Sequence, residues 1–213
     1  MKKVLIIGDS ISKGYDKFVK AAFKESAEVF SPTENCRFSP SVFRHFTDWL
    51  KASGFNGDEV DCVHWNAGLW DCLIIYEEGN LIPIEMYELF IGRICRLIKR
   101  VCPNAKIIFA TSTPVNEAGY GKNFKRFNKD IEAYNEAALR IVKEYGFAVN
   151  DLYGLLKDAP AEYHSDMTHY YTEAATKKIT EKVCSAITEA IGILPGEVDY
   201  STYFKKKDEI VGI

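Results

Sequence analysis

Short apolar runs alternate with longer segments of helical period along almost the whole chain, and this alternation restricts the fold more than any other feature. The predicted strands occupy residues 4–7, 27–30, 60–65, 106–111 and 147–149. The predicted helices occupy residues 11–24, 41–53, 84–101, 130–145 and 172–191. Strands that alternate with helices form a parallel sheet covered on both faces. The sequence therefore predicts an α/β fold, a flavodoxin-like three-layer α/β/α sandwich with a central parallel sheet of about five strands.

The chain of 213 residues is long enough to bury the core of one domain. No repeat, low-complexity segment or linker divides it. We therefore expect one domain over residues 1–195 and a tail over residues 196–213, which is either a small extension or an oligomer contact. The sequence leaves the oligomeric state open.

Charge and cysteine usage restrict the partners. A formal net charge of −3 provides no positive field for a phosphate backbone, so nucleic acid is not an expected partner. The first apolar run is too short for a signal-peptide core or a membrane span, which predicts a cytoplasmic protein without a membrane partner, although a chain trimmed of its signal would look the same. The six cysteines form no CxxC pair or His-rich cluster, so neither a metal nor another cofactor is expected.

Polar residues follow or precede the predicted elements at four places where a ligand is expected to bind. In an open α/β sheet, ligands gather at the carboxyl ends of the strands. The four segments are residues 8–12, 34–37, 66–71 and 166–169.

Ser10 lies at the turn between the first strand and the first helix. This position exposes its hydroxyl at the sheet edge and places its own backbone N–H at a helix start, where developing negative charge is stabilised. The alternative is that Ser10 only caps the helix. Asp9 is expected to order the turn through hydrogen bonds to backbone N–H groups.

A nucleophilic serine needs a base at neutral pH, and imidazole is the side chain suited to that role. His169 follows Asp166 by three residues, a spacing that lets one turn hold the carboxylate against the imidazole. His164 lies in the same loop and is the competing base. His64, in a predicted strand, and His45, on a predicted helix, are expected to be core or surface residues.

Gly8-Asp9-Ser10 near the start and Asp166-x-x-His169 near the end together resemble the first and last sequence blocks of the SGNH/GDSL hydrolase family. The resemblance covers nearly the whole chain, with residues 103–106 and 150–153 also in the expected order. It implies Ser10 as nucleophile, His169 as general base and Asp166 as the residue that orients the imidazole, with no cofactor or metal.

The resemblance also implies an oxyanion hole made by the Ser10 N–H, a glycine N–H in the second block and an asparagine side chain in the third. This sequence departs twice, because Arg37 stands at the glycine and Trp70 at the asparagine. A positive φ at Arg37 would be strained. Asn66 is the nearest replacement donor, and Asn35 is the second candidate.

Aromatic residues near the strand ends suit a sugar ring or an acyl group, although aromatic side chains are also ordinary core residues. These aromatic residues are Trp65, Trp70, Tyr76 and Tyr120, and we expect them to line the pocket together with Arg37. The family resemblance implies a serine esterase acting on a small-molecule ester with a small acyl group, such as acetyl on a carbohydrate. Three alternatives stay open: a lysophospholipase or thioesterase of the same family, a flavodoxin-like binding module for a phosphorylated ligand, and a catalytically inactive scaffold.

Overall fold

Five parallel strands form the central sheet of the computed structural model, which describes residues 1–204. They are β1 (Lys2–Ile7), β2 (Ala27–Phe30), β3 (Cys62–Trp65), β5 (Lys106–Ala110) and β7 (Ala148–Asn150), in the spatial order β2-β1-β3-β5-β7. Counted along the chain, the order of these five strands is 2-1-3-4-5, which is the flavodoxin-like order. The predicted fold class is therefore confirmed. Part of the predicted tail, residues 205–213, lies outside the described residues.

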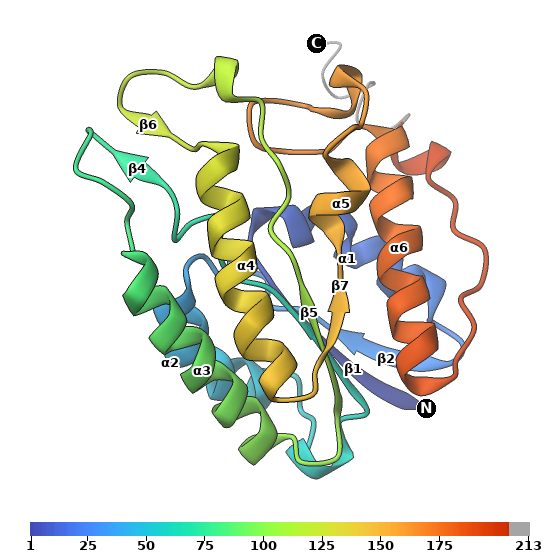
Figure 1. The fold of residues 1–213 in the computed structure, drawn as a ribbon. Coiled ribbons are helices and arrows are strands. Elements are labelled where there is room, and N and C mark those ends of the chain that lie inside the picture. The colour runs from blue at the N-terminus through green and yellow to red at the C-terminus, as the bar shows by residue number, and fades with distance from the viewer. Residues whose placement is uncertain (205–213) are drawn as a thin grey trace.

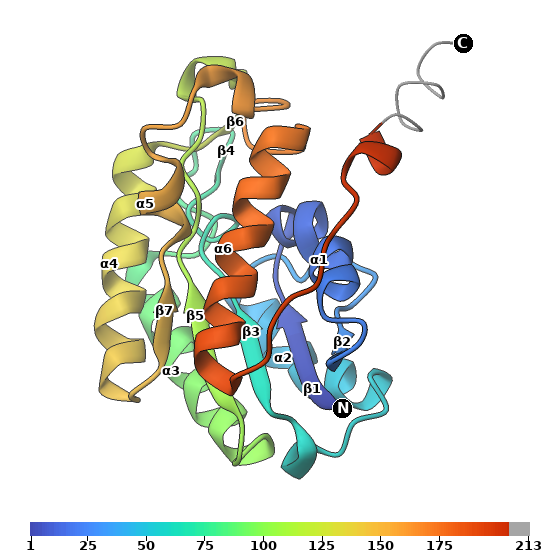
Figure 2. The same ribbon diagram turned by 90° about the vertical axis from the view of Figure 1, so that its right-hand side faces the viewer.

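Helices cover both faces of the sheet (Figure 1). One face carries α1 (Ser10–Ala22) and α6 (Glu173–Ile191), with the short α5 (Leu152–Leu156) beside α6. The other face carries α2 (Ser39–Ala52), α3 (Ile84–Val101) and α4 (Asn128–Glu144). Figure 2 shows the layer of α1 and α6 from the front, with the sheet behind it.

The core lies between these layers because the central strands are apolar on both sides. The last four residues of β1 and all four residues of β3 are buried, as is typical of parallel strands covered on both faces. All six cysteines are buried and unpaired. No helix within residues 1–204 is long and apolar enough to cross a membrane.

Local signals set most of the helix ends. Thr172 caps α6 by accepting from the Ala175 N–H, and Gly192 ends that helix at a φ of +71°. The helix α2 begins at Ser39, two residues before the predicted start, because Pro40 is tolerated in the first turn of a helix.

The sequence did not predict a small antiparallel sheet made of β4 (Ile74–Ile75) and β6 (Phe124–Lys125). Each strand has two residues, which is too short to show a period of two. It also did not predict α5. In Figure 1 the small sheet lies at the upper edge of the molecule, toward which the arrow of β7 points. It therefore stands over the end of the fold where a site is expected.

Candidate active site

The first strand delivers Ser10 to the carboxyl edge of the sheet. β1 ends at Ile7 and α1 begins at Ser10, so Gly8 and Asp9 make the whole turn. Asp9 caps α1, with its Oδ1 accepting from the Ile11 N–H at 2.9 Å. A Cβ on Gly8 would lie 2.4 Å from the Asn66 side-chain oxygen, so the close approach of these two loops requires glycine.

Ser10, His169 and Asp166 form one hydrogen-bonded chain. His169 Nε2 lies 2.8 Å from the Ser10 Oγ, and His169 Nδ1 lies 2.7 Å from the Asp166 Oδ2. The serine comes from the start of α1 and the other two residues come from the loop before α6. The fold thus brings together two segments that are 159 residues apart in the chain.

Asp166 orders its own loop as well as the imidazole. Its Oδ1 accepts hydrogen bonds from the backbone N–H groups of Thr168, at 2.7 Å, and His169, at 2.8 Å. Burial raises the pKa of the Asp166 carboxyl, but these hydrogen bonds and the bond to the imidazole outweigh burial and lower the pKa below 3.8. The carboxylate is therefore ionised at neutral pH, with its charge directed at Nδ1.

Tyr171 supports this arrangement, although sequence analysis assigned no role to it. Its hydroxyl donates to the Ser10 backbone carbonyl at 2.5 Å, and its ring stacks on the imidazole of His169 with centroids 4.7 Å apart. The signal available in the sequence was its position, two residues after His169 and directly before the helix cap Thr172. Tyr171 thus ties the histidine loop to the serine turn.

The other histidines do not contact Ser10. His64 is buried in β3 with Nε2 3.0 Å from the Asn150 side-chain nitrogen, and burial lowers its pKa to about 4. His164 stacks on Tyr170 with centroids 4.2 Å apart. His45 is exposed on α2.

The candidate oxyanion donors lie in different situations. The Ser10 N–H has no acceptor within residues 1–204 and is free to bind an oxyanion. Arg37 adopts the left-handed φ of +59° that favours glycine, and its N–H donates to the Asn35 Oδ1 at 2.8 Å. The Asn66 amide donates to Asp9 at 3.3 Å and accepts from the Asp9 N–H at 3.4 Å. In this geometry both amides shape their loops, and their role as oxyanion donors stays a prediction.

A cavity of about 720 Å³ opens beside the triad. Its lining includes Ser10, His169, Trp70, Tyr120, Phe124 and Arg126. Asn35, Arg37 and Asn66 are not among the lining residues.

Two of the aromatic residues expected near the site contribute to this cavity, and two do not. Trp70 and Tyr120 line it. Trp65 is fully buried in the core, and Tyr76 is 63% exposed, against the ring of Phe124.

Arg126 is the polar lining residue that sequence reasoning missed. Its Nε donates to the Leu69 carbonyl at 2.5 Å, and its Nη1 donates to the Tyr120 hydroxyl at 3.3 Å. The guanidinium carbon lies 5.8 Å from the ring centroid of Trp70. No local signal in the sequence marked this residue, because it directly follows β6, a strand of only two residues.

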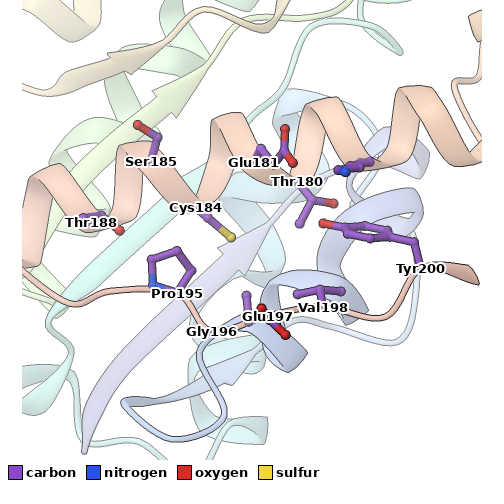
Figure 3. Close-up of a pocket in the computed structure, with 12 residues that line it drawn as sticks. Thr180, Glu181, Cys184, Ser185, Thr188, Pro195, Gly196, Glu197, Val198 and Tyr200 are labelled. Carbon is purple, nitrogen blue, oxygen red and sulfur yellow. The ribbon is translucent and has the colours of Figure 1, made fainter.

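A second cavity, of about 550 Å³, lies between α6 and residues 195–200 (Figure 3). Figure 3 shows the side chains of Cys184 and Tyr200 in the space between α6 and this segment. It shares no lining residue with the cavity beside the triad and contains none of the residues predicted to react.

Among the comparisons with known proteins, the one with solved structures bears on the fold. No protein-family model matches the sequence, and no curated protein matches it. Among solved structures, a lipase/acylhydrolase from Enterococcus faecalis is similar with a TM-score of 0.71 and 16% identity, over 93% of this chain and all of that one. The acetyl xylan esterase AlAXEase is similar with a TM-score of 0.68 and 16% identity, over 87% of this chain and 99% of that one.

A GDSL-like lipase from Bacteroides thetaiotaomicron has a TM-score of 0.68 and 18% identity, over 89% of each chain. At these identities the likeness establishes the fold, which is that of GDSL-like lipases and acylhydrolases, as the sequence resemblance implied. What the chain does with this fold depends on its own residues.

Proposed function

We propose that this protein is a serine ester hydrolase that removes small acyl groups through an acyl-enzyme intermediate. The observation that carries the proposal is the hydrogen-bonded chain from Ser10 through His169 to Asp166 at the mouth of a cavity. A nucleophile bonded to a base, and a base oriented by a third group, is the arrangement that activates a serine.

The proposed mechanism gives each proton a path. As the Ser10 Oγ attacks the ester carbonyl, its proton passes to His169 Nε2, 2.8 Å away. Asp166 holds the Nδ1 proton and stabilises the imidazolium. The negative charge on the former carbonyl oxygen meets the free N–H of Ser10 at the start of α1, where the helix dipole is favourable.

The remaining steps use the same groups in reverse. His169 gives its proton to the departing alcohol, so that the ester C–O bond breaks and the acyl group stays on Ser10. A water molecule then attacks the acyl-enzyme, His169 takes its proton, and the acid leaves as Ser10 regains a proton.

The substrate part of the proposal is an acetyl ester on a carbohydrate. The aromatic faces of Trp70, Tyr120 and Phe124 in the cavity suit a pyranose ring. The similar fold of an acetyl xylan esterase supports this choice by analogy. A lysophospholipase or thioesterase would use the same triad with a longer acyl group.

The test is hydrolysis of 4-nitrophenyl esters from acetate to octanoate by the wild type, Ser10→Ala and His169→Ala proteins. Matched controls are Ser185→Ala and His45→Ala, both at exposed helix positions. We expect kcat to fall by about 10³-fold or more in the two triad variants and to stay unchanged in the controls. Highest activity on acetate would support the small acyl group, and highest activity on octanoate would favour the lipase alternative. Equal rates in wild type and triad variants would refute the proposed hydrolase.

A further inference from the structure

The Lys and Arg side chains that line the cavity beside the triad have no acidic side chain among the other lining residues of the described chain. These two basic residues are Arg126 and Lys122. This imbalance stands out in a protein whose formal net charge is −3. A cavity lined by one sign of charge concentrates ligands of the opposite sign.

Arg126 is buried without a carboxylate partner. The residue is only 7% exposed, and its guanidinium forms no ion pair within residues 1–204. A guanidinium has five N–H donors, of which the Leu69 carbonyl and the Tyr120 hydroxyl use two. A buried cation is ordinarily paired, because desolvation disfavours its charge.

The carboxylates buried behind the cavity are bonded to other groups. Both oxygens of Asp71 accept from Ser39, and those of Asp9 accept from Ile11 and Asn66. The charge of Arg126 lowers the pKa of Asp9, but burial has the larger effect and raises it. Neither carboxylate therefore replaces a direct partner for the guanidinium.

We propose that Arg126 is a specificity-determining residue that binds a carboxylate carried by the ester substrate. The inference rests on the proposed esterase function and narrows its substrate class to esters with an anionic acyl or alcohol part. The planar guanidinium matches a carboxylate with two parallel hydrogen bonds. The ring of Trp70, 5.8 Å from the guanidinium carbon, and the bond to the Leu69 carbonyl hold the fork in place.

The kinetic test compares two esters that differ only in charge, mono-4-nitrophenyl succinate and its neutral methyl ester. We expect the wild type to prefer the anionic ester, and Arg126→Gln to lower the ratio of the two kcat/KM values by about 10- to 100-fold. Because the readout is a ratio, a loss common to both esters does not affect it. Lys125→Gln is the matched control: Lys125 is the next residue along the chain, pairs with Glu77 at 3.1 Å and should leave the ratio unchanged.

A binding measurement makes the test independent of turnover. Calorimetric titration of the Ser10→Ala protein with monomethyl succinate should show binding at least about tenfold tighter than with dimethyl succinate, and adding Arg126→Gln should abolish this difference. Arg126→Lys, which keeps the charge, serves if the glutamine variant fails to fold, and should retain part of the preference.

The outcomes separate the two proposals. Ser10-dependent hydrolysis of the neutral ester without any wild-type preference for the anion would overturn the role of Arg126 and leave the esterase standing. If neither ester is hydrolysed, the esterase fails, and the titration alone decides whether the anion site exists. Equal binding of the charged and neutral ligands would overturn it.

Discussion

Replacing Asp166 by asparagine tests whether the mechanism depends on a proton held on His169 Nδ1. The Asp166 Oδ2 lies 2.7 Å from this nitrogen and can only accept a hydrogen bond, so the imidazole proton is held there and Nε2 is free to accept from Ser10. An asparagine amide at the same place donates instead. It favours the tautomer with the proton on Nε2, which cannot take the proton of the serine.

We expect Asp166→Asn to lower kcat by about 10³- to 10⁴-fold, the loss known for a triad held in the wrong tautomer. The fold should change little, because the asparagine oxygen still accepts from the Thr168 and His169 N–H groups, as the Oδ1 of Asp166 does at 2.7 and 2.8 Å. Asp166→Ala loses both of these hydrogen bonds. Its free energy of unfolding should therefore fall by about 1 to 3 kcal/mol, taking about 0.5 to 1.5 kcal/mol for each hydrogen bond.

The assay is the initial rate on 4-nitrophenyl acetate, with guanidinium unfolding measured on the same preparations. Asp151→Asn is the matched control, because the Asp151 Oδ1 caps α5 by accepting from the Gly154 N–H at 2.8 Å and the residue lies outside the cavity. Its kcat should equal that of the wild type. An Asp166→Asn protein that keeps more than about a tenth of the wild-type kcat would refute the tautomer argument.

Two further predictions concern stability. Arg37→Gly should raise the free energy of unfolding by about 1 kcal/mol, because glycine relieves a left-handed φ of +59°. Glu77→Gly, at a φ of +66°, should raise it by a similar amount. In urea titrations, a stabilised Glu77→Gly beside a destabilised Arg37→Gly would contradict the prediction for Arg37. Burial lowers the pKa of His64 to about 4, so the stability that its neutral form contributes is lost as pH falls from about 6.5 to 4. Burial raises the pKa of Asp71 to about 6, so the stability that its protonated form contributes is lost as pH rises from about 4 to 6. We compare the change in the free energy of unfolding between pH 4.5 and pH 7. This change should be about 2 kcal/mol more positive in Asp71→Asn than in wild type, and about 2 kcal/mol less positive in His64→Gln. If both variants change it in the same direction, the assignment of the two pKa shifts is wrong.

The sheet was predictable because local signals and burial agree in its strands. The apolar run at residues 4–7 is too short for a buried helix and is followed by a turn, and the observed β1 contains it entirely. For α6, the predicted start at residue 172 is the observed cap, Thr172. Where propensity, pattern and capping point to one structure, a single sequence is sufficient.

The contact between Asp166 and His169 was also predictable, because they lie three positions apart in one turn. Their approach to Ser10 followed from the rule that strand ends share one edge and from the matching sequence blocks. The orientation of Asn66 could not be foreseen. It depends on the space that Gly8 leaves open and on the two hydrogen bonds with Asp9, which exist only once β1 and β3 are paired.

The part of the cavity wall that Arg126 forms was beyond single-sequence reasoning for a different reason. Arg126 follows β6, a strand of two residues that exists only through pairing with β4, about 50 positions earlier in the chain. Nothing local marks such a segment as structured. Sequence analysis therefore gave no reason to single out Arg126.

Trp70 and Arg126 belong together physically. An asparagine at position 70 would offer a neutral donor to the oxyanion, whereas an indole offers a π face, and the guanidinium of Arg126 lies within cation–π distance of it. The Leu69 carbonyl, just before Trp70, accepts from the same guanidinium. The loop that departs from the family pattern is thus organised around a cation from another segment.

The presence of Arg126 beside Trp70 is the physical reason for the proposed preference for charged esters. Burying a guanidinium without a carboxylate partner carries a desolvation cost, and a neutral acetyl ester does not offset it. A substrate carboxylate supplies the missing partner, so its binding is favoured by the desolvation already imposed on Arg126 in the free protein. On this proposal, Arg126 directs the cavity toward esters that carry a carboxylate.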